Sequence, residues 1–301
     1  MVATRETDLG ALYAHFIAGR RVHGDGEPDL VRANPAATDE VLGSLRSADV
    51  ETVREAVQTA AEAWPKWRNT PAPTRGRVLL EAARLMDVHR AELAELIALE
   101  EGKALKDART EVQRGINITE FMAGEGRRYG GYTSASESST KFAFTTRQPL
   151  GVVACITPWN FPIAIPAWKI APALVAGNSV ILKPASSTPG CAVRLAEIYQ
   201  EAGVPDGVLN VLAARGGPAA EALLDAEEVR AVSLTGSTVT GRHVAARCAA
   251  RGVPVQAELG GKNAAVVLAD ADLELAAAGI VDGAFGSTGQ RCTATSRTIV
   301  V

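Results

Sequence analysis

The chain has 301 residues, of which 47% are hydrophobic and 22% charged, and its formal net charge at pH 7 is −3. This composition excludes a largely disordered chain, because enough apolar surface is available to offset the entropy of ordering the backbone. The small negative charge creates no field that attracts nucleic acid, and no uncharged apolar run approaches the roughly 18 residues needed to cross a bilayer. We therefore expect neither a nucleic-acid nor a membrane partner.

Four cysteines are spread along the chain at Cys155, Cys191, Cys248 and Cys292, with no CxxC pair and no histidine at metal-ligand spacing. A chain of this length does not need disulfides, so we expect reduced thiols, no metal site and a cytoplasmic location. The first 16 residues mix charged and apolar side chains and lack the continuous apolar segment of a signal peptide.

The N-terminal third predicts short strands followed by helices. Residues 16–22 look like a strand pair bent at Gly19, and Asn34-Pro35 marks a further turn. Three helices are predicted: one capped by Asp49 and running to about Trp64 before Pro65, one capped by Thr74 with a single apolar stripe from Leu79 to Leu96, and one from about Ala104 to Tyr129, ended by Gly130-Gly131. Residues 133–149 then alternate from Lys141 to Arg147, which predicts a strand ribbon leaving the domain or a surface hairpin with no partner.

From residue 150 onward, short apolar runs alternate with helical patterns. The runs are 151–156, 179–182, 208–212 and 231–234, and the helices between and after them are 163–176, 189–202, 217–224 and 238–251. Such alternation predicts βαβ units around a parallel sheet, an α/β fold. Two more strands at 253–257 and 264–268, a helix at 272–284 and a strand at the end of the chain follow.

Parallel sheets bind ligands at the carboxyl ends of their strands, so the loops after residues 156, 182 and 234 are candidate sites. Asn160 offers an amide donor for an oxyanion, or a cap for the next helix. Lys183 could bond a ribose hydroxyl or a phosphate, or lie along the sheet rim. The Gly236-Ser237 turn precedes a helix N-terminus, which favours a pyrophosphate, although it is neither a P-loop nor a GxGxxG fingerprint.

Two further segments carry groups for catalysis. Glu258 stands before paired glycines, where a partly desolvated carboxylate could act as a general base; the alternative is a surface glutamate before a turn. Cys292 lies among glycines, and Arg291 or a helix N-terminus could favour its thiolate. We interpret the other three cysteines as small buried hydrophobic residues.

Each motif alone is weak, but their order and spacing are informative. The segments ITPWNFP, LKPAS, LTGSTVTG, ELGGKNAAVV and GQRCTA together resemble the aldehyde dehydrogenase superfamily, as do the intervals from Asn160 to Lys183 and from Glu258 to Cys292. The resemblance spans nearly the whole chain. It is strongest to 2-oxoglutarate semialdehyde dehydrogenases and then to succinate semialdehyde dehydrogenases.

The resemblance implies a catalytic role for three residues. The Cys292 thiolate attacks the aldehyde, the Asn160 amide and the Cys292 backbone N–H hold the oxyanion, and Glu258 activates the water that releases the acid. The implied cofactor is NADP or NAD. Because neutral Ser186 stands where many NAD-preferring members carry a glutamate, we expect NADP to be accepted and to be the better candidate for the preferred cofactor.

The implied cofactor-binding residues are Ile156, Thr157, Pro158, Trp159, Lys183, Ala185, Ser186, Gly217, Gly236, Ser237, Leu259 and Gly260. The implied aldehyde tunnel comprises Phe161, Trp168 and Arg291, whose alternative roles are ordinary packing for the aromatic residues and a structural or surface role for the arginine. The small-molecule substrate would be a semialdehyde with a distal carboxylate.

The resemblance also implies a domain arrangement. A Rossmann-like NAD(P)-binding domain comprises residues 1–132 and 150–258, a protruding oligomerisation strand comprises 133–149, and a second α/β catalytic domain begins at 259–301. Family members continue well beyond this point, so we expect a truncated chain, and a homodimer or homotetramer if the full chain is present. The rival hypotheses are a non-catalytic dinucleotide-binding fragment and a cofactor-independent thiol esterase that uses Cys292 and Glu258.

Overall fold

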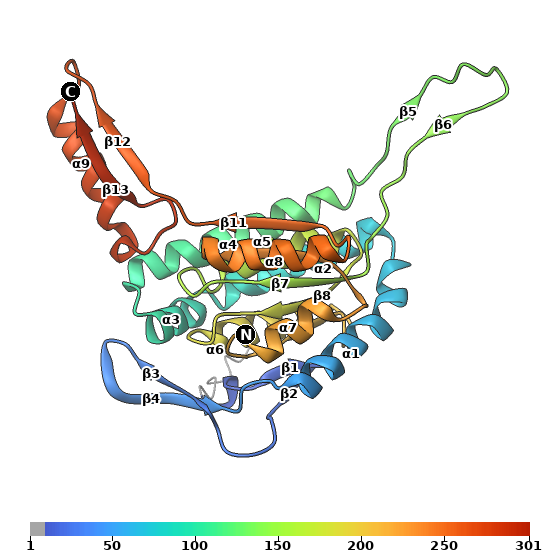
Figure 1. Ribbon diagram of the computed structural model, residues 1–301, viewed down its shortest axis with the longest axis horizontal. Coiled ribbons are helices and arrows are strands. Elements are labelled where there is room, and N and C mark those ends of the chain that lie inside the picture. The colour runs from blue at the N-terminus through green and yellow to red at the C-terminus, as the bar shows by residue number, and fades with distance from the viewer. Residues whose placement is uncertain (1–9) are drawn as a thin grey trace.

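The computed structural model describes residues 10–301 (Figure 1). Residues 1–9 lie outside the described residues. They include the start of the predicted cofactor domain and part of the N-terminal stretch in which we expected no signal peptide. The helices are α1 (Val50–Arg68), α2 (Ala72–Val88), α3 (Arg90–Glu101), α4 (Leu105–Glu125), α5 (Ala164–Val175), α6 (Pro189–Glu201), α7 (Pro218–Asp225), α8 (Thr238–Ala250), α9 (Leu273–Phe285) and the short η1 (Gly10–Leu12) and η2 (Gly286–Gly289). The strands are β1 (His15–Ile17), β2 (Arg20–Val22), β3 (Leu30–Asn34), β4 (Ala37–Leu45), β5 (Thr133–Ser134), β6 (Ala143–Phe144), β7 (Val152–Ile156), β8 (Ser179–Lys183), β9 (Leu209–Val211), β10 (Val229–Gly236), β11 (Val255–Leu259), β12 (Asn263–Val267) and β13 (Thr295–Val300). Within residues 10–301, no helix combines the length and the apolar character needed to cross a membrane.

The central sheet confirms the predicted Rossmann-like α/β fold. Its seven strands follow the order β11-β10-β7-β8-β9-β1-β2, and the neighbours from β11 to β9 run parallel. The predicted strand pair at residues 16–22 is also confirmed, and it extends this sheet because β1 pairs antiparallel with β9. Strands β8 and β9 lie on one side of β7. Strands β10 and β11 lie on its other side. The strand order therefore reverses between β7 and β10, and such switch points are where open α/β sheets bind ligands.

Strand β7 shows how the sheet becomes buried on both faces. Val153 and Cys155 join the larger apolar cluster, to which α2 to α6 contribute. Val152 and Ala154 join a second cluster with residues of α1, α7 and α8. Because successive side chains of a strand point to opposite faces, a run of apolar residues without alternation is what a doubly covered strand requires.

The first helix is longer than predicted, because tertiary contacts carry it past a proline. Helix α1 continues through Pro65 to Arg68, so the prediction that it ends at about Trp64 is wrong. The indole N–H groups of Trp64 and Trp67 donate to the carbonyl oxygens of Gly177 and Leu174, each at 3.0 Å. These bonds and the burial of Trp67 hold the last turn although Pro65 lacks a backbone donor.

The next helices also begin and end elsewhere than predicted. Helix α2 begins at Ala72, and Thr74 is not its cap because its N–H donates to the Pro71 carbonyl within the first turn. A first turn tolerates prolines since its N–H groups have no intrahelical partner. The single apolar stripe is divided between α2 and α3 at His89, whose φ of −92° and ψ of 16° break the helix. Helix α4 ends at Glu125 rather than Tyr129, in a stretch weakened by the low helix propensity of Gly124 and Gly126.

Two parts of the chain extend away from the body in different directions (Figure 1). One is the ribbon of β5 and β6, which pair antiparallel as the alternation at 141–147 indicated. The other comprises β12, α9 and β13, in which β12 and β13 form a separate parallel pair. Helix α9 has no buried residue in this structure.

Candidate active site

The strand register brings the predicted loops to one edge of the sheet. Ile156 at the end of β7 is paired with Lys183 of β8 and with Leu234 of β10. Thr235 of β10 is in turn paired with Glu258 of β11. Most of the other predicted cofactor residues lie at or after these strand ends: Thr157 to Trp159 after β7, Ala185 and Ser186 after β8, Gly236 and Ser237 at the end of β10, and Leu259 and Gly260 at the end of β11. Gly217 instead precedes α7.

The side chain of Asn160 joins the first loop to the segment that carries Cys292. Its Nδ2 donates to the carbonyl oxygen of Gln290 at 2.7 Å, across 130 positions of sequence. The alternative role as a helix cap is absent, because the first amides of α5, those of Ile163 and Ala164, donate to Glu111 instead. The Asn160 amide therefore lies beside the nucleophile segment rather than on its own helix.

The nucleophile segment, residues 286–292, has a backbone held by contacts from outside it. Ser287 and Thr288 have φ of 53° and 56°, a left-handed conformation that costs a non-glycine residue roughly 1–2 kcal/mol. The Ser287 N–H donates to Asp107 Oδ2 of α4 at 3.2 Å. Asn263 Nδ2 of β12 donates to the Cys292 carbonyl at 2.8 Å. These two bonds hold a loop whose own residues disfavour its shape.

Cys292 differs from the other cysteines in its surroundings. Its side chain is exposed, whereas Cys155, Cys191 and Cys248 are buried, as we interpreted them from the sequence. Burial raises the pKa of Cys155 to about 12 and also raises the pKa values of Cys191 and Cys248. These three thiols therefore stay protonated near neutral pH, and Cys292 is the exposed cysteine within residues 10–301.

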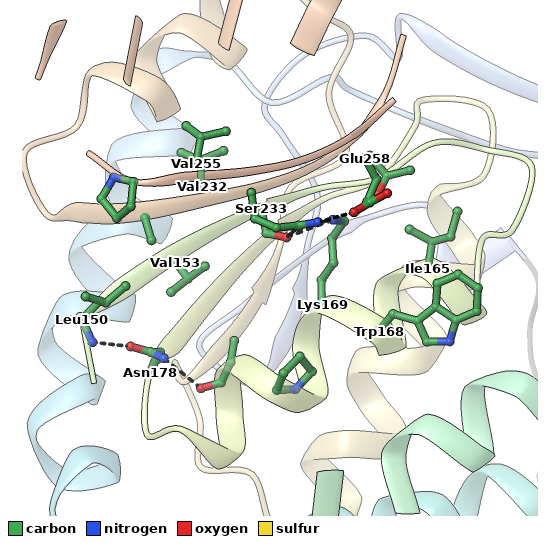
Figure 2. Close-up of a pocket in the computed structure, with 16 residues that line it drawn as sticks. Leu150, Val153, Ile165, Trp168, Lys169, Asn178, Val232, Ser233, Val255 and Glu258 are labelled. Atoms are coloured by element: carbon green, nitrogen blue, oxygen red, sulfur yellow. Dashed lines mark hydrogen bonds between the residues drawn. The ribbon is translucent and has the colours of Figure 1, made fainter. Parts of the chain in front are cut away.

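Glu258 lies on the rim of a groove of about 510 Å³ between α5 and the strands β10 and β11 (Figure 2). Its Oε1 accepts from Gln256 Nε2 at 2.9 Å. Gln256 Oε1 in turn accepts from Ser233 Oγ at 2.5 Å and from Lys169 Nζ at 3.3 Å. Burial lowers the pKa of Lys169. The Glu258 side chain itself is exposed, so the partial desolvation that would favour a general base is not present in this structure.

Buried carboxylates occupy the N-termini of two helices that follow sheet strands. Glu111 Oε1 accepts from the N–H groups of Ile163 and Ala164 at the start of α5, at 2.9 and 3.2 Å. Glu100 accepts from Gly190 and Cys191 at the start of α6, at 2.9 and 2.8 Å. These helix ends attract anions, and the protein fills both with its own side chains.

The start of α8 is open instead. Ser237 is exposed and its hydroxyl accepts from the Thr240 N–H at 3.1 Å, while a Cβ added to Gly236 would meet nothing closer than 3.9 Å. Of the helix ends at α5, α6 and α8, that of α8 is the one that an external phosphate can approach.

The Lys183 ammonium group has no anionic partner in the part of the chain that the structure describes. Burial lowers its pKa. Its Nζ donates to the Pro184 carbonyl at 3.4 Å, and no carboxylate among residues 10–301 pairs with it. Because an unpaired buried charge is unfavourable, an anionic ligand at this point would be stabilising. Neutral Ser186 follows three residues later and adds no negative charge.

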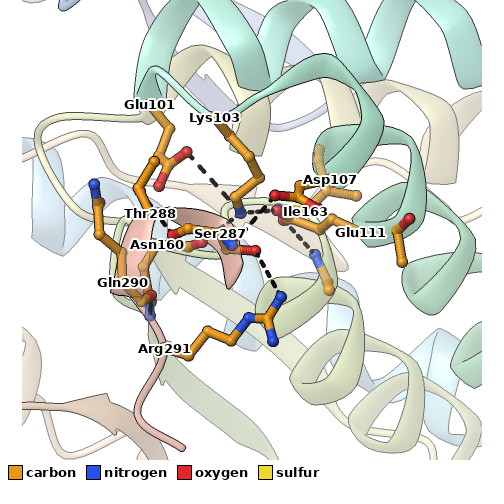
Figure 3. A network of polar contacts seen from close by, with 12 residues as sticks. Glu101, Lys103, Asp107, Glu111, Asn160, Ile163, Ser287, Thr288, Gln290 and Arg291 are labelled. Atoms are coloured by element: carbon orange, nitrogen blue, oxygen red, sulfur yellow. Dashed lines mark hydrogen bonds and ion pairs between the residues drawn. The ribbon is translucent and has the colours of Figure 1, made fainter. Parts of the chain in front are cut away.

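A buried polar network beside Asn160 was not predicted (Figure 3). Lys103 Nζ donates to Glu111 Oε2 at 2.5 Å and to the Asn160 carbonyl at 2.6 Å. Its centre of charge also lies 4.0 Å from the ring centroid of Phe161. The one signal in the sequence was Glu111 itself, a carboxylate on the buried stripe of α4 next to Val112. Its partner could not be identified from local pattern.

The three residues expected in an aldehyde tunnel have different surroundings. Trp168 is 42% exposed and lines the groove that also contains Glu258. Phe161 is buried and packs with Ala164 and Ile165 beneath Lys103, outside the residues that line this groove. Arg291 folds back on its own segment, with Nη2 donating to Ser287 Oγ at 3.4 Å. A common wall made of all three therefore stays a prediction.

Comparison with known proteins finds relatives that align with most of this chain. The chain is 43% identical over 286 residues to the 2,5-dioxopentanoate dehydrogenase of Saccharolobus solfataricus. The aligned region covers 94% of this chain and 60% of the relative. It is 42% identical over 288 residues to the alpha-ketoglutaric semialdehyde dehydrogenase of Bacillus subtilis, covering 96% of this chain and 59% of the relative. A crystal structure of an NADP-dependent enzyme from E. coli superimposes with a TM-score of 0.93 at 38% identity, over 96% of this chain and 60% of that one.

The chain thus spans about 60% of the length of the curated relatives it matches. The family model described as "Aldehyde dehydrogenase family" matches residues 22–301, which includes the sheet, the Asn160 loop and the segment carrying Cys292. The ordered motifs, the fold and this match agree, and the chain belongs to the aldehyde dehydrogenase family.

Proposed function

We propose that this chain supplies the cofactor-binding part and the nucleophile of an enzyme that oxidises an aldehyde to a carboxylic acid with NAD(P)+ as oxidant. The observation that carries the proposal is the 2.7 Å contact between Asn160 Nδ2 and the Gln290 carbonyl, two residues before Cys292. It supports a common site for an exposed thiol and an amide donor. Family membership supports the reaction type.

In this mechanism the Cys292 sulfur attacks the aldehyde carbon, and the carbonyl oxygen becomes an oxyanion. Asn160 Nδ2 has a second hydrogen besides the one directed at Gln290, and it donates this hydrogen to the oxyanion. When bound, the oxidised nicotinamide supplies a hydride acceptor. Loss of hydride from the substrate carbon leaves a thioester on Cys292, which water hydrolyses to the acid.

Glu258 is the proposed base that takes a proton from this water. In the present structure its carboxylate is held by Gln256 at the rim of the groove. Because removal from bulk solvent strengthens a carboxylate as a base, we propose that substrate and cofactor, when bound, shield Glu258 from all but the reacting water.

The proposed cofactor site lies at the ends of β8 and β10. The open start of α8 at Gly236 and Ser237 suits a pyrophosphate, since backbone N–H groups there point toward an approaching anion. The unpaired Lys183 suits the adenosine ribose or its phosphate. Neutral Ser186 supports acceptance of NADP as well as NAD, and the structural relative from E. coli is described as NADP dependent.

The proposed substrate is a semialdehyde with a distal carboxylate. The support is the identity of more than 40% to relatives named 2,5-dioxopentanoate and alpha-ketoglutaric semialdehyde dehydrogenases. Arg291 is a candidate for binding the distal carboxylate, although it bonds Ser287 here.

We further propose that the enzyme is a cytoplasmic homodimer or homotetramer in which residues 133–149 pair with another subunit. The ribbon presents Phe142 and Phe144 at 75% and 62% exposure. Solvent-exposed aromatic pairs of this kind are typical of interfaces. The four free cysteines support a reducing compartment.

The test mixes the purified chain with 2-oxoglutarate semialdehyde and either NAD+ or NADP+, and follows the ultraviolet absorbance of the NAD(P)H that forms. We expect reduction that Cys292→Ala abolishes and that the matched variant Cys248→Ala retains. Binding of cofactor without reduction would instead support the dinucleotide-binding fragment. Ester hydrolysis without cofactor would support the thiol esterase, and either result would overturn the proposal.

A further inference from the structure

We infer that Lys103 is a positioning residue for the oxyanion donor: its ammonium fixes the main chain of Asn160 so that the Asn160 amide faces the nucleophile segment. The inference rests on the proposed function. It concerns a residue at the turn between α3 and α4, outside the loops that carry the catalytic groups.

The ammonium of Lys103 is enclosed on several sides. Its side chain is 1% exposed. It donates to the Glu111 carboxylate at 2.5 Å and to the Asn160 carbonyl at 2.6 Å, and it lies over the Phe161 ring at 4.0 Å. The Glu101 carboxylate, whose side chain is also 1% exposed, lies 4.0 Å from the Lys103 Nζ. Lys103 therefore has one geometry available, and that geometry includes a bond to the residue that supplies the amide.

A chain of hydrogen bonds connects Lys103 to the candidate active site. Lys103 holds the Asn160 carbonyl, while Glu111, its other partner, holds the amides of Ile163 and Ala164. The main chain on both sides of Phe161 is thus fixed. From this fixed backbone, the Asn160 side chain reaches the Gln290 carbonyl at 2.7 Å.

A residue just after this turn also holds the nucleophile segment directly. Asp107, on the first turn of α4, accepts from the Ser287 N–H at 3.2 Å. The short segment from Lys103 to Asp107, which leads into α4, therefore contacts both the donor loop and the thiol-bearing segment (Figure 3). The relative placement of Asn160 and Cys292 follows from these two attachments.

Packing alone does not explain a lysine at this position. Burying an ammonium between carboxylates costs desolvation energy, and an apolar side chain would cover Phe161 without that cost. What an apolar side chain cannot do is donate to the Asn160 carbonyl. What the lysine contributes and an apolar side chain does not is therefore the orientation of Asn160.

The test uses Lys103→Met, Asn160→Ala and the double variant in the 301-residue chain, with Lys106→Met as the matched control, since Lys106 is exposed on the same turn. NAD(P)H formation gives kcat and the KM for cofactor. Loss of one oxyanion donor lowers kcat by about 100- to 1,000-fold, so we expect Lys103→Met to lower it by at least about 10-fold with the cofactor KM unchanged. In the Asn160→Ala background it should cost less than about 2-fold, because two residues that act through one another are not additive.

Lys103→Arg should restore part of the rate, because it retains a donor for the carbonyl. A merely structural lysine would lower kcat by the same factor in both backgrounds, and that result overturns the inference. Should Lys103→Met fail to fold, Lys103→Met/Glu111→Gln removes both charges of the 2.5 Å pair, and the same comparison is made with it. If that variant keeps the wild-type kcat, the inference is wrong.

Hydrogen exchange separates this inference from the proposed function. Peptides covering residues 286–291 should exchange at least about threefold faster in Lys103→Met and in Asn160→Ala, with no further increase in the double variant. Unchanged exchange in Lys103→Met overturns the inference even if the chain is active. Absence of NAD(P)H formation in wild type, with the expected exchange pattern, overturns only the proposed function.

Discussion

Gln256 Nε2 lies 2.9 Å from Glu258 Oε1, a bond between two side chains of the same strand. Residues two apart in a strand share a face, so β11 presents both to the groove beside α5. Ser233 and Lys169 hold the other end of the Gln256 amide. The orientation of the Glu258 carboxylate therefore depends on three neighbours, and Gln256 transmits their effect.

Replacing Gln256 by Met should slow thioester hydrolysis more than hydride transfer. The Met side chain keeps the volume but cannot donate to Glu258, so the base loses its orientation. We expect a steady-state rate about 10-fold lower, preceded by an undiminished burst of NAD(P)H. Stopped-flow absorbance measures both phases, with Gln113→Met as the control, since the Gln113 amide bonds Asn117 on α4. Equal losses in burst and steady state would contradict this role.

Alkylation should be selective for Cys292. Burial raises the pKa of Cys155 to about 12 and raises those of Cys191 and Cys248, so burial both shields these thiols and disfavours their thiolates. Treatment of the native chain with iodoacetamide should add one carbamidomethyl group, located at Cys292 by peptide mass spectrometry. After unfolding in guanidinium, all four cysteines should react. If the native chain is labelled first at Cys155, Cys191 or Cys248, that cysteine is not buried in solution, which would contradict the structure.

The variant Ser186→Glu should move cofactor preference toward NAD. A carboxylate near Lys183 would pair with its ammonium and repel a 2′-phosphate, and a repulsion of roughly 1.4 kcal/mol corresponds to tenfold. We expect kcat/KM for NADP to fall by about 10-fold relative to NAD. Ser187→Glu, the neighbouring position, is the control for added charge. A strong NAD preference already present in wild type would count against the role given to Ser186.

The stability of the fold should decrease in acid through His15. This ring is fully buried, its Nδ1 accepts from the Ala213 N–H at 3.2 Å, and burial lowers its pKa to about 4. The unfolded chain binds a proton near pH 6.5 whereas the folded chain resists it, so this stabilisation is complete above pH 6.5 and is lost as the pH falls to 4.

The free energy of unfolding should therefore fall by up to about 3 kcal/mol more in wild type than in His15→Gln between these pH values. Urea unfolding at several pH values measures this difference. The exposed His243, replaced by Gln, serves as control. Parallel pH profiles for wild type and His15→Gln would show that His15 is not the group responsible.

Local pattern was sufficient for the alternation of strands and helices from residue 150 onward. Buried strands such as β7 and β8 are short uninterrupted apolar runs, and the helices between them repeat at helical spacing, because each element follows from the conformational preferences of neighbouring residues. The ordered motifs around Asn160, Glu258 and Cys292 likewise identified the family. Local pattern failed at Pro65, where the helix continues because two tryptophans bond to the distant C-terminal end of α5 and to the glycine after it.

The sequence by itself thus determined the α/β class, the family and the loops in which the site would be sought. The tertiary structure decided which side chains meet there: Asn160 with Gln290, Lys103 with Asn160, and the hairpin at residues 15–22 with β9. The physical reason is that periodicity reports only which face of an element is apolar. A buried charge such as Lys103 is stable only with its partners, and those partners are brought to it by folding across many positions of sequence.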